Sequence, residues 1–262
     1  PKSMWQKLNQ PDENNMCTWA MRCLLVEDGN RLILIDNGIG NKQDDKFFGH
    51  YFLHGDTSLD QSLKAAGFSK DDITDVFLTH LHFDHCGGSI EWNKDKTGFV
   101  PAFKNAHFWS NANHWEWATK PNSREKASFL KENILPIQES GQLKFIENAG
   151  NEFPQQISIR QAFGHTDAMM LPQVNYKGRT IVFMADLLPS AAHIPLPYVM
   201  GYDMFPLTTL VEKKSFLTEA YQKNYTLFFE HDPMNECCHL QLTDKGIRVK
   251  DVFRLSSLPQ TE

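Results

Sequence analysis

The stretch Thr79-His80-Leu81-His82-Phe83-Asp84-His85-Cys86-Gly87-Gly88 decides how this chain is interpreted. Four of its side chains can bind a metal ion and lie within six positions of one another: His80, His82, Asp84 and His85. His80 and His82 are two residues apart, so both imidazoles point to the same side at the end of an extended strand. The glycine pair that follows permits a tight turn and a close approach of another backbone segment. The stretch therefore predicts a metal centre at the end of a strand over residues 76–79.

The ligand types in this stretch indicate a catalytic metal rather than a structural one. Imidazole and carboxylate ligands without a thiolate suit zinc, and also iron, manganese or cobalt. A structural zinc site normally closes with cysteine ligands, but Cys86 is adjacent to His85 and not at a ligand spacing. Open coordination positions therefore favour catalysis.

Further candidate ligands follow other predicted strands. Strands are expected over residues 157–163, 180–185 and 225–229, and they lead into His165, Asp186 and His231 respectively. Loops at one edge of a rigid sheet commonly carry catalytic residues. A hairpin is expected upstream, with strands over residues 24–26 and 32–35 and a turn over residues 27–30. Strands alternating with helices predict a layered α/β architecture.

The expected helices follow capping signals. Residues 59–66 have helical spacing, with Ser58 as N-cap and Gly67 beyond the end. Ser110 and Ser123 suit helix starts, whereas Pro121 and Pro136 suit helix ends. Thr209 with Glu212 resembles a capping box at the head of a helix that runs to about Lys223.

Composition limits the function classes. The chain of 262 residues has 41% hydrophobic and 22% charged residues, which is ordinary for a globular protein, and its formal net charge is −6. A small-molecule substrate is the expected partner. An acidic balance argues against nucleic acid or an anionic membrane as the main partner. The five cysteines show no disulfide or redox spacing.

One domain over residues 1–262 is the economical interpretation, because no repeat or linker-like stretch interrupts the pattern. The sequence begins with Pro1 rather than Met, so we expect that an N-terminal segment is missing. A cytoplasmic location is favoured, with a removed export signal as the alternative. A homodimer is a further expectation.

The motifs together resemble those of the metallo-β-lactamase fold superfamily, in the arm that carries a complete HxHxDH set. The resemblance continues through Gly164-His165-Thr166, Ala185-Asp186 and His231-Asp232, and an early strand and turn match Leu32 to Gly38. It implies a four-layer αββα sandwich.

The resemblance also implies a ligand set. One metal would be held by His80, His82 and His165, the other by Asp84, His85 and His231, with Asp186 bridging the two. The pair of cations, most simply Zn²⁺, would share a hydroxide nucleophile. The other metal, or Asp84 or Asp186, would help with the leaving group.

The subgroup resembled most contains N-acyl-homoserine lactone lactonases, other small-lactone hydrolases and methyl-parathion-hydrolase-like enzymes. A tyrosine in that subgroup assists the substrate carbonyl, and Tyr198 and Tyr202 are the candidates here. The expected activity is therefore metal-dependent hydrolysis of a lactone, most specifically an N-acyl-homoserine lactone, as in quorum quenching.

Several alternatives remain at the level of sequence. A phosphotriesterase-like, other ester or β-lactam hydrolase would use the same centre. A diiron redox protein of this fold usually has a carboxylate at the position of His82 and a flavin domain. A nuclease is disfavoured by the acidic balance.

Overall fold

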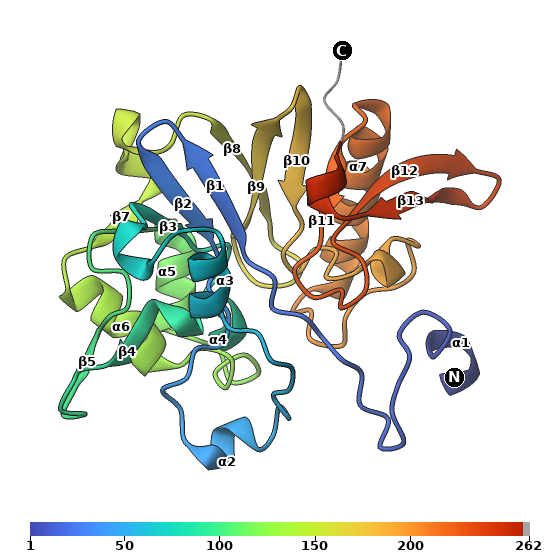
Figure 1. The fold of residues 1–262 in the computed structure, drawn as a ribbon. Helices are drawn as coiled ribbons and strands as arrows, with labels where there is room; N and C mark the ends of the chain where they lie inside the picture. The colour runs from blue at the N-terminus through green and yellow to red at the C-terminus, as the bar shows by residue number, and fades with distance from the viewer. Residues whose placement is uncertain (259–262) are drawn as a thin grey trace. The chain divides into compact units, whose positions relative to one another are not determined.

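The computed structural model describes residues 1–258, which divide into two compact units. One unit comprises residues 1–22 together with the chain from Gln155 onward, and the other comprises residues 23–154. We call them the C-terminal unit and the N-terminal unit. Each contains one principal sheet with helices, which confirms the expected α/β class (Figure 1).

The N-terminal unit is built on a five-stranded sheet in the order β1-β2-β3-β6-β7. Its strands are β1 (Leu24–Asp28), β2 (Arg31–Ile35), β3 (Asp75–Phe77), β6 (His107–Ser110) and β7 (Leu143–Phe145), and a separate pair is formed by β4 (Ile90–Trp92) and β5 (Phe99–Pro101). The predicted hairpin is confirmed, because β1 and β2 pair antiparallel with Asp28 opposite Arg31. The other strands run parallel to β2, so the carboxyl ends of β2 and β3 share one edge.

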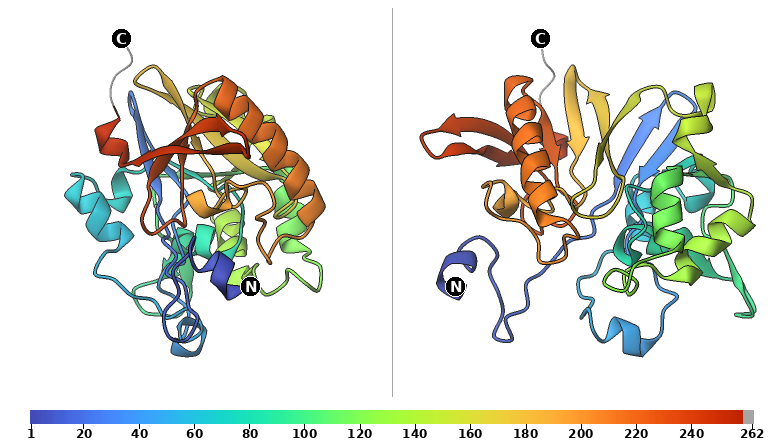
Figure 2. Two further views of the ribbon diagram at one scale, coloured as in Figure 1. Left: turned by 90° about the vertical axis from the view of Figure 1, so that its right-hand side faces the viewer. Right: turned by 180° about the vertical axis from the view of Figure 1, so that it is seen from behind.

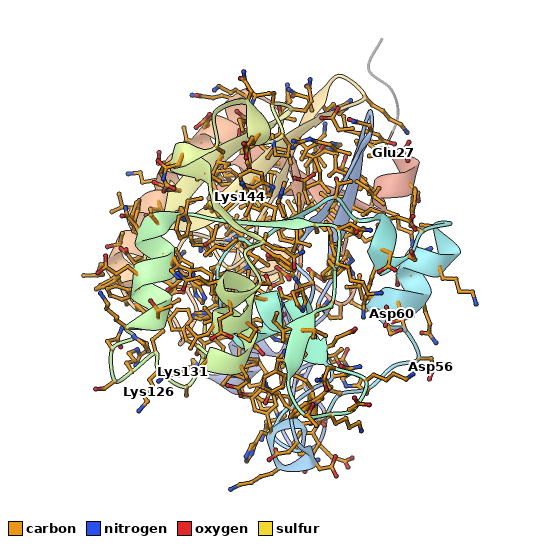
Figure 3. The ribbon with its side chains drawn as sticks, turned by 90° about the vertical axis from the view of Figure 1, so that its left-hand side faces the viewer. Glu27, Asp56, Asp60, Lys126, Lys131 and Lys144 are labelled. Atoms are coloured by element: carbon orange, nitrogen blue, oxygen red, sulfur yellow. The ribbon has the colours of Figure 1, made fainter. Side chains whose placement is uncertain are left out.

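Helices pack on this sheet around an apolar core. They are α2 (Asp45–Phe48), α3 (Leu59–Ala65), α4 (Phe83–Cys86), α5 (Ala112–Thr119) and α6 (Lys131–Glu139). Leu34 and Phe108 from the strands meet Leu63 of α3 and Ile137 of α6 in the core. Charged side chains such as Asp56, Asp60 and Lys131 stand on the outer surface of this unit (Figure 3).

The helix limits partly correct the sequence expectations. Ser58 caps α3 as predicted, by accepting a hydrogen bond from the Gln61 N–H. Asn111 rather than Ser110 caps α5, since its side-chain oxygen reaches the backbone N–H three residues on. Pro136 lies inside α6, and Ser123 begins no helix in the described chain. Pro136 is the sixth of the nine residues of α6, so the helix continues past a residue that cannot donate the usual backbone hydrogen bond.

The C-terminal unit is built on a six-stranded sheet in the order β13-β12-β11-β10-β9-β8. Its elements are α1 (Lys2–Trp5), β8 (Ile157–Ala162), β9 (Met169–Tyr176), β10 (Arg179–Phe183), α7 (Pro206–Gln222), β11 (Thr226–Phe228), β12 (Cys237–Thr243) and β13 (Gly246–Phe253). β10 and β11 are parallel, and the other pairs are antiparallel. α7 lies beside β12 and β13 in both views of Figure 2.

The predicted capping box at Thr209 and Glu212 is wrong. α7 begins three residues earlier, with Pro206 in its first turn, where the missing N–H and the fixed φ of proline do no harm. Glu212 instead accepts hydrogen bonds from the backbone N–H groups of Phe163 (2.7 Å) and Gly164 (3.0 Å). It therefore holds the loop that leads to His165.

None of the helices within residues 1–258 is both long and apolar enough to span a bilayer.

Candidate metal centre

In the N-terminal unit, the HxHxDH stretch follows β3 and turns into α4. Nε2 of His80 and Nδ1 of His82 lie 3.1 Å apart, and both side chains are buried. The structure thus brings these two predicted ligands together as the alternation of an extended chain requires. His85 Nε2 lies 3.8 Å from Oδ2 of Asp84, which stands half-buried on α4.

The other ring nitrogen of each histidine in this stretch has a partner. The Thr79 hydroxyl donates to Asp36 Oδ2 (2.6 Å) and lies 3.1 Å from His80 Nδ1, so its oxygen can accept the His80 Nδ1–H. His85 Nδ1 lies 3.1 Å from the same Asp36 oxygen. Such partners set the tautomer of a ligating imidazole and orient its ring. They leave Nε2 of His80 and Nε2 of His85 as the nitrogens available to a metal.

His82 has its hydrogen-bond partner at Nε2, whereas His80 and His85 have theirs at Nδ1. Its Nε2 lies 2.9 Å from Oε1 of Glu125, a carboxylate with only 3% of its surface exposed. Glu125 also accepts hydrogen bonds from Trp117 Nε1 (2.7 Å) and the Asn122 amide (3.2 Å). His82 would therefore offer Nδ1 to a metal.

Backbone contacts hold the stretch in place. The Leu81 N–H donates to Nε2 of His114 (2.8 Å). His114 therefore has a structural role, because it fixes the backbone of the residue between His80 and His82. A Cβ atom at Gly87 would lie 2.2 Å from the Ile39 carbonyl oxygen, so no larger residue fits there. The predicted close approach at this glycine is confirmed.

In the C-terminal unit, three predicted ligands meet after separate strands. Asp186 follows β10, and its Oδ2 lies 3.0 Å from Nε2 of His165, which follows β8. Its Oδ1 lies 3.0 Å from Nε2 of His231, which follows β11. One carboxylate thus faces two imidazoles, which is the arrangement a bridging ligand needs.

A hydrogen-bond partner at Nδ1 also orients each of these two imidazoles. His165 Nδ1 lies 3.0 Å from Oδ1 of Asp203, and the His231 Nδ1–H donates to the Ala20 carbonyl oxygen (2.7 Å). Burial alone would lower the pKa of His165, but the carboxylates of Asp186 and Asp203 raise it to about 9. Both contacts leave Nε2 directed at Asp186.

The backbone is strained next to two of the carboxylates. Asp36 has φ +54° and Ala185, just before Asp186, has φ +39°. Left-handed backbone is unfavourable for residues other than glycine and tends to occur at functional sites. The strain thus coincides with the strand ends that present the donor groups.

The two tyrosines stand on the long loop between Asp186 and α7. Tyr202 is 71% exposed. Tyr198 is half-buried, and its carbonyl oxygen accepts a hydrogen bond from the buried Lys213 ammonium. His193 lies on the same loop with its Nδ1 2.8 Å from the Ser190 hydroxyl, and burial lowers its pKa to about 4. The participation of either tyrosine in the reaction stays a prediction.

Sequence reasoning missed the groups behind the ligands: Glu125, Asp203 and the Ala20 carbonyl, together with the role of Asp36. The sequence could have indicated Asp36, because it follows a predicted strand directly, as His80 does. Glu125 and Asp203 are 43 and 38 residues from their histidines, and nothing in the local sequence marks them.

The donor chemistry fits divalent metal ions. Each unit presents imidazole and carboxylate donors of the kind that bind such ions: His80, His82, Asp84 and His85 in the N-terminal unit, and His165, Asp186 and His231 in the C-terminal unit. Cys86 does not compete, because burial raises the pKa of its thiol to about 12 and its Sγ contacts the Leu81 carbonyl. Which residue binds which ion stays a prediction.

Comparison with known proteins agrees with this chemistry. The chain is 26% identical over 132 residues to the N-acyl homoserine lactonase AiiA of Bacillus thuringiensis subsp. kurstaki, which covers 47% of this chain and 45% of that protein. The chain spans less than half the length of the curated relatives that it matches.

Solved structures match over longer stretches. A probable metal-dependent hydrolase from Staphylococcus aureus superposes with a TM-score of 0.85 at 24% identity, over 99% of this chain and 90% of that one. AidC, a dizinc quorum-quenching lactonase in complex with a product, superposes with a TM-score of 0.70 at 25% identity, over 90% of this chain and 81% of that one. The first likeness confirms the predicted fold, and the name of the second neighbour agrees with the expected class of enzyme.

A sequence model described as the metallo-beta-lactamase superfamily matches residues 22–231, which include every predicted ligand. The chain therefore belongs to the metallo-β-lactamase superfamily.

Proposed function

We propose that this chain is a two-metal hydrolase that opens lactones, with an N-acyl-homoserine lactone as the specific substrate. The observation that carries the proposal is the Asp186 carboxylate, each oxygen of which faces the Nε2 atom of a different histidine. The lactonase named among the curated relatives and the dizinc lactonase AidC support the choice of substrate and of Zn²⁺.

The ligand assignment in this proposal is the one that the family resemblance implies. His80, His82 and His165 would hold one ion, and Asp84, His85 and His231 the other, with Asp186 shared. When bound, two divalent cations supply an acidified water nucleophile at neutral pH and polarise the substrate carbonyl.

The chain's own groups would then manage protons and orientation. Water adds to the lactone carbonyl carbon, the ring C–O bond breaks, and the product is a hydroxy acid. The half-buried carboxylate of Asp84 is the group proposed to carry the proton of the water to the departing alkoxide oxygen. Tyr198 or Tyr202 is proposed to donate a hydrogen bond to the carbonyl oxygen, where charge develops.

A substrate panel tests the proposal. Purified zinc-loaded protein is assayed with homoserine lactones of several acyl lengths, an aryl ester, a phosphotriester and a β-lactam. Ring opening of the lactones, with a preference over the other substrates, is expected. Cleavage of the phosphotriester without the lactones would replace this function with a phosphotriesterase-like one.

Variants test the centre itself. His80→Ala and Asp186→Ala should abolish activity while circular dichroism shows an intact fold. Unchanged activity in both would refute the mechanism. Tyr198→Phe and Tyr202→Phe, measured separately, identify which hydroxyl assists the carbonyl, if one lowers kcat while the other does not.

We also propose a small molecule as the partner, without nucleic acid or membrane, and a homodimer as the assembly. Sedimentation of the purified chain tests the dimer. A cytoplasmic location is proposed on the same footing and is tested by fractionation of the source cells.

A further inference from the structure

Residues 19–22 run along the turn that carries His231, within the C-terminal unit. The Ala20 N–H donates to the His231 carbonyl oxygen (3.0 Å), and the Arg22 N–H donates to the Glu230 carbonyl oxygen (3.0 Å). The two hydrogen bonds join alternate residues of this segment to adjacent residues of the turn, so they do not form a regular strand ladder. This segment, which we call the N-terminal arm, is therefore hydrogen-bonded to the backbone of residues 230–231 without extending the sheet.

The arm also contacts the His231 side chain. The Ala20 carbonyl oxygen accepts the His231 Nδ1–H at 2.7 Å, which makes Nε2 the nitrogen that faces Asp186. The Trp19 ring packs on the imidazole with 5.1 Å between ring centroids. The arm thus specifies both the tautomer and the ring orientation of His231.

Arg22 fastens the arm to the turn. Its Nη1 atom donates to the carbonyl oxygens of Phe229 (2.7 Å) and Asp232 (3.0 Å). These two residues lie on either side of His231 in the sequence, so one guanidinium spans the turn. A planar, always-charged donor group can serve two fixed acceptors at once, which a lysine ammonium does less well.

We propose that Arg22 is a positioning residue for His231, and that the N-terminal arm couples its own docking to metal affinity. The inference rests on the proposed function, because His231 matters as a metal ligand there. Arg22 contacts no reacting atom; it acts by holding the Ala20 carbonyl against His231.

Metal affinity and the His231 tautomer test this role. Zinc binding by full-length Arg22→Gln is measured by competition with a chromophoric chelator, and the histidine ring is followed by ¹⁵N NMR. We expect affinity to fall about 10–100-fold, the range seen when groups that orient ligands are removed. The Nδ1–H signal of His231 should weaken, and Arg22→Lys should recover part of the affinity.

Lys7→Gln is the matched control, because it removes an exposed cation from the same N-terminal region. It should bind zinc like the wild type. Equal affinity and an equal Nδ1–H signal in wild type and Arg22→Gln would overturn the positioning role. Wild-type protein that binds no zinc at all would instead refute the proposed function.

A second inference concerns a cavity in the C-terminal unit whose lining does not include the N-terminal arm or His231. The cavity has a volume of about 240 Å³ and is lined by residues from the starts of β10 and β11, the end of α7, and β12 and β13. Arg179, Lys250 and His239 line it together with Tyr221 and Asn224.

Lys250 reaches the cavity because of a β-bulge. His239 pairs with Asp251 and Leu240 pairs with Val249, so Lys250 is the extra residue on its strand. A bulge of this kind re-aims a side chain. Asp251 on the same strand is engaged by His239, with its Oδ1 3.0 Å from Nδ1.

The Asp251 carboxylate lines the cavity together with the two cations. Among residues 1–258, Arg179 Nε is buried without a hydrogen-bond partner, and the two side chains take part in no ion pair in that range. Both cations act to lower the pKa of His239, after burial as the main cause. A buried unsatisfied donor calls for an acceptor, and guanidinium groups match the oxygens of phosphate and carboxylate.

We propose that this cavity binds a small oxyanion, with Arg179 and Lys250 as its cationic ligands. Inorganic phosphate and acetate are titrated by calorimetry at constant ionic strength, with chloride as the background anion. Phosphate but not acetate would assign the site to phosphate groups. Saturable binding of either anion that falls at least tenfold in Arg179→Gln and in Lys250→Gln is expected.

Two controls separate this site from the metal centre and from bulk charge. Asp186→Asn, which alters the candidate metal centre, should retain the phosphate binding that Arg179→Gln removes. Lys245→Gln, on the turn of the same hairpin and outside the cavity lining, should bind like the wild type. Undiminished binding in both cavity variants, or no binding to the wild type, would overturn the proposal.

Discussion

Glu125 Oε1 lies 2.9 Å from His82 Nε2, and this contact leaves His82 Nδ1 as the nitrogen that faces His80. The carboxylate is buried and is held by Trp117 and Asn122. His82 is therefore pre-oriented by a group 43 residues further along the chain.

Glu125→Gln should weaken metal binding by about 10–100-fold, because the neutral amide orients the imidazole less well and lowers its basicity. Competition titration with a chelator measures the affinity. Glu116→Gln, on the exposed face of α5 where it pairs with Lys120, is the control and should bind metal normally. Unchanged affinity in Glu125→Gln would show that the contact does not matter for the metal.

Gly164→Ala should destabilise the protein and displace His165. A Cβ atom at this position would lie 2.4 Å from the backbone nitrogen of Thr209 on α7, so the loop or the helix must move. Overpacking of this kind costs about 1–3 kcal/mol. Urea unfolding measures the loss, and metal content reports the displacement.

Gly201→Ala is the matched control for that substitution, because a Cβ atom there would meet nothing within 4 Å. A difference in unfolding free energy smaller than the experimental error between the two variants would contradict the close contact at Gly164.

Lys213 should make stability depend on alkaline pH. The side chain is buried in α7 and donates to the Pro195, Leu196 and Tyr198 carbonyl oxygens. Burial lowers its pKa from 10.5 to about 8. Between these two values the unfolded chain binds more protons than the folded one, so the contribution of Lys213 to the unfolding free energy rises with pH.

The measurement compares wild type with Lys213→Met in urea at pH 7.5, 8.5 and 9.5. The stability of the wild type relative to the variant should increase over this series, because other titrating groups cancel in the difference. Lys214→Met, an exposed neighbour, should show a constant difference. A wild-type advantage that declines with pH would mean that the Lys213 pKa is raised instead.

Removal of divalent metal should lower the melting temperature. A ligand that binds only the folded state at 100 times its Kd stabilises that state by about 2.7 kcal/mol, which corresponds to about 5–10 °C for a chain of this size. Differential scanning calorimetry with and without EDTA measures the shift. Readdition of zinc should restore the original temperature. Loss of metal without a change in melting temperature would argue against a metal site that exists only in the folded state.

The sequence by itself determined the ends of the strands and the chemistry placed there. Alternating and continuous apolar runs located β2, β3, β8, β10 and β11 within a residue or two, because burial of a strand demands that pattern. The HxHxDH spacing identified the superfamily, which the match over residues 22–231 confirms. The helix limits at Ser123, Pro136 and Thr209 were less well predicted, since packing can override capping preferences.

Only the tertiary structure decided which ring nitrogen each histidine presents. That choice depends on Thr79, Glu125, Asp36, Asp203 and the Ala20 carbonyl, as the hydrogen bonds show. Most of these partners are distant in sequence, and one is a main-chain atom that no residue type reveals. A hydrogen bond forms between atoms that folding brings together, so local sequence cannot encode it. The ligand types were therefore readable from the chain, whereas their orientation was not.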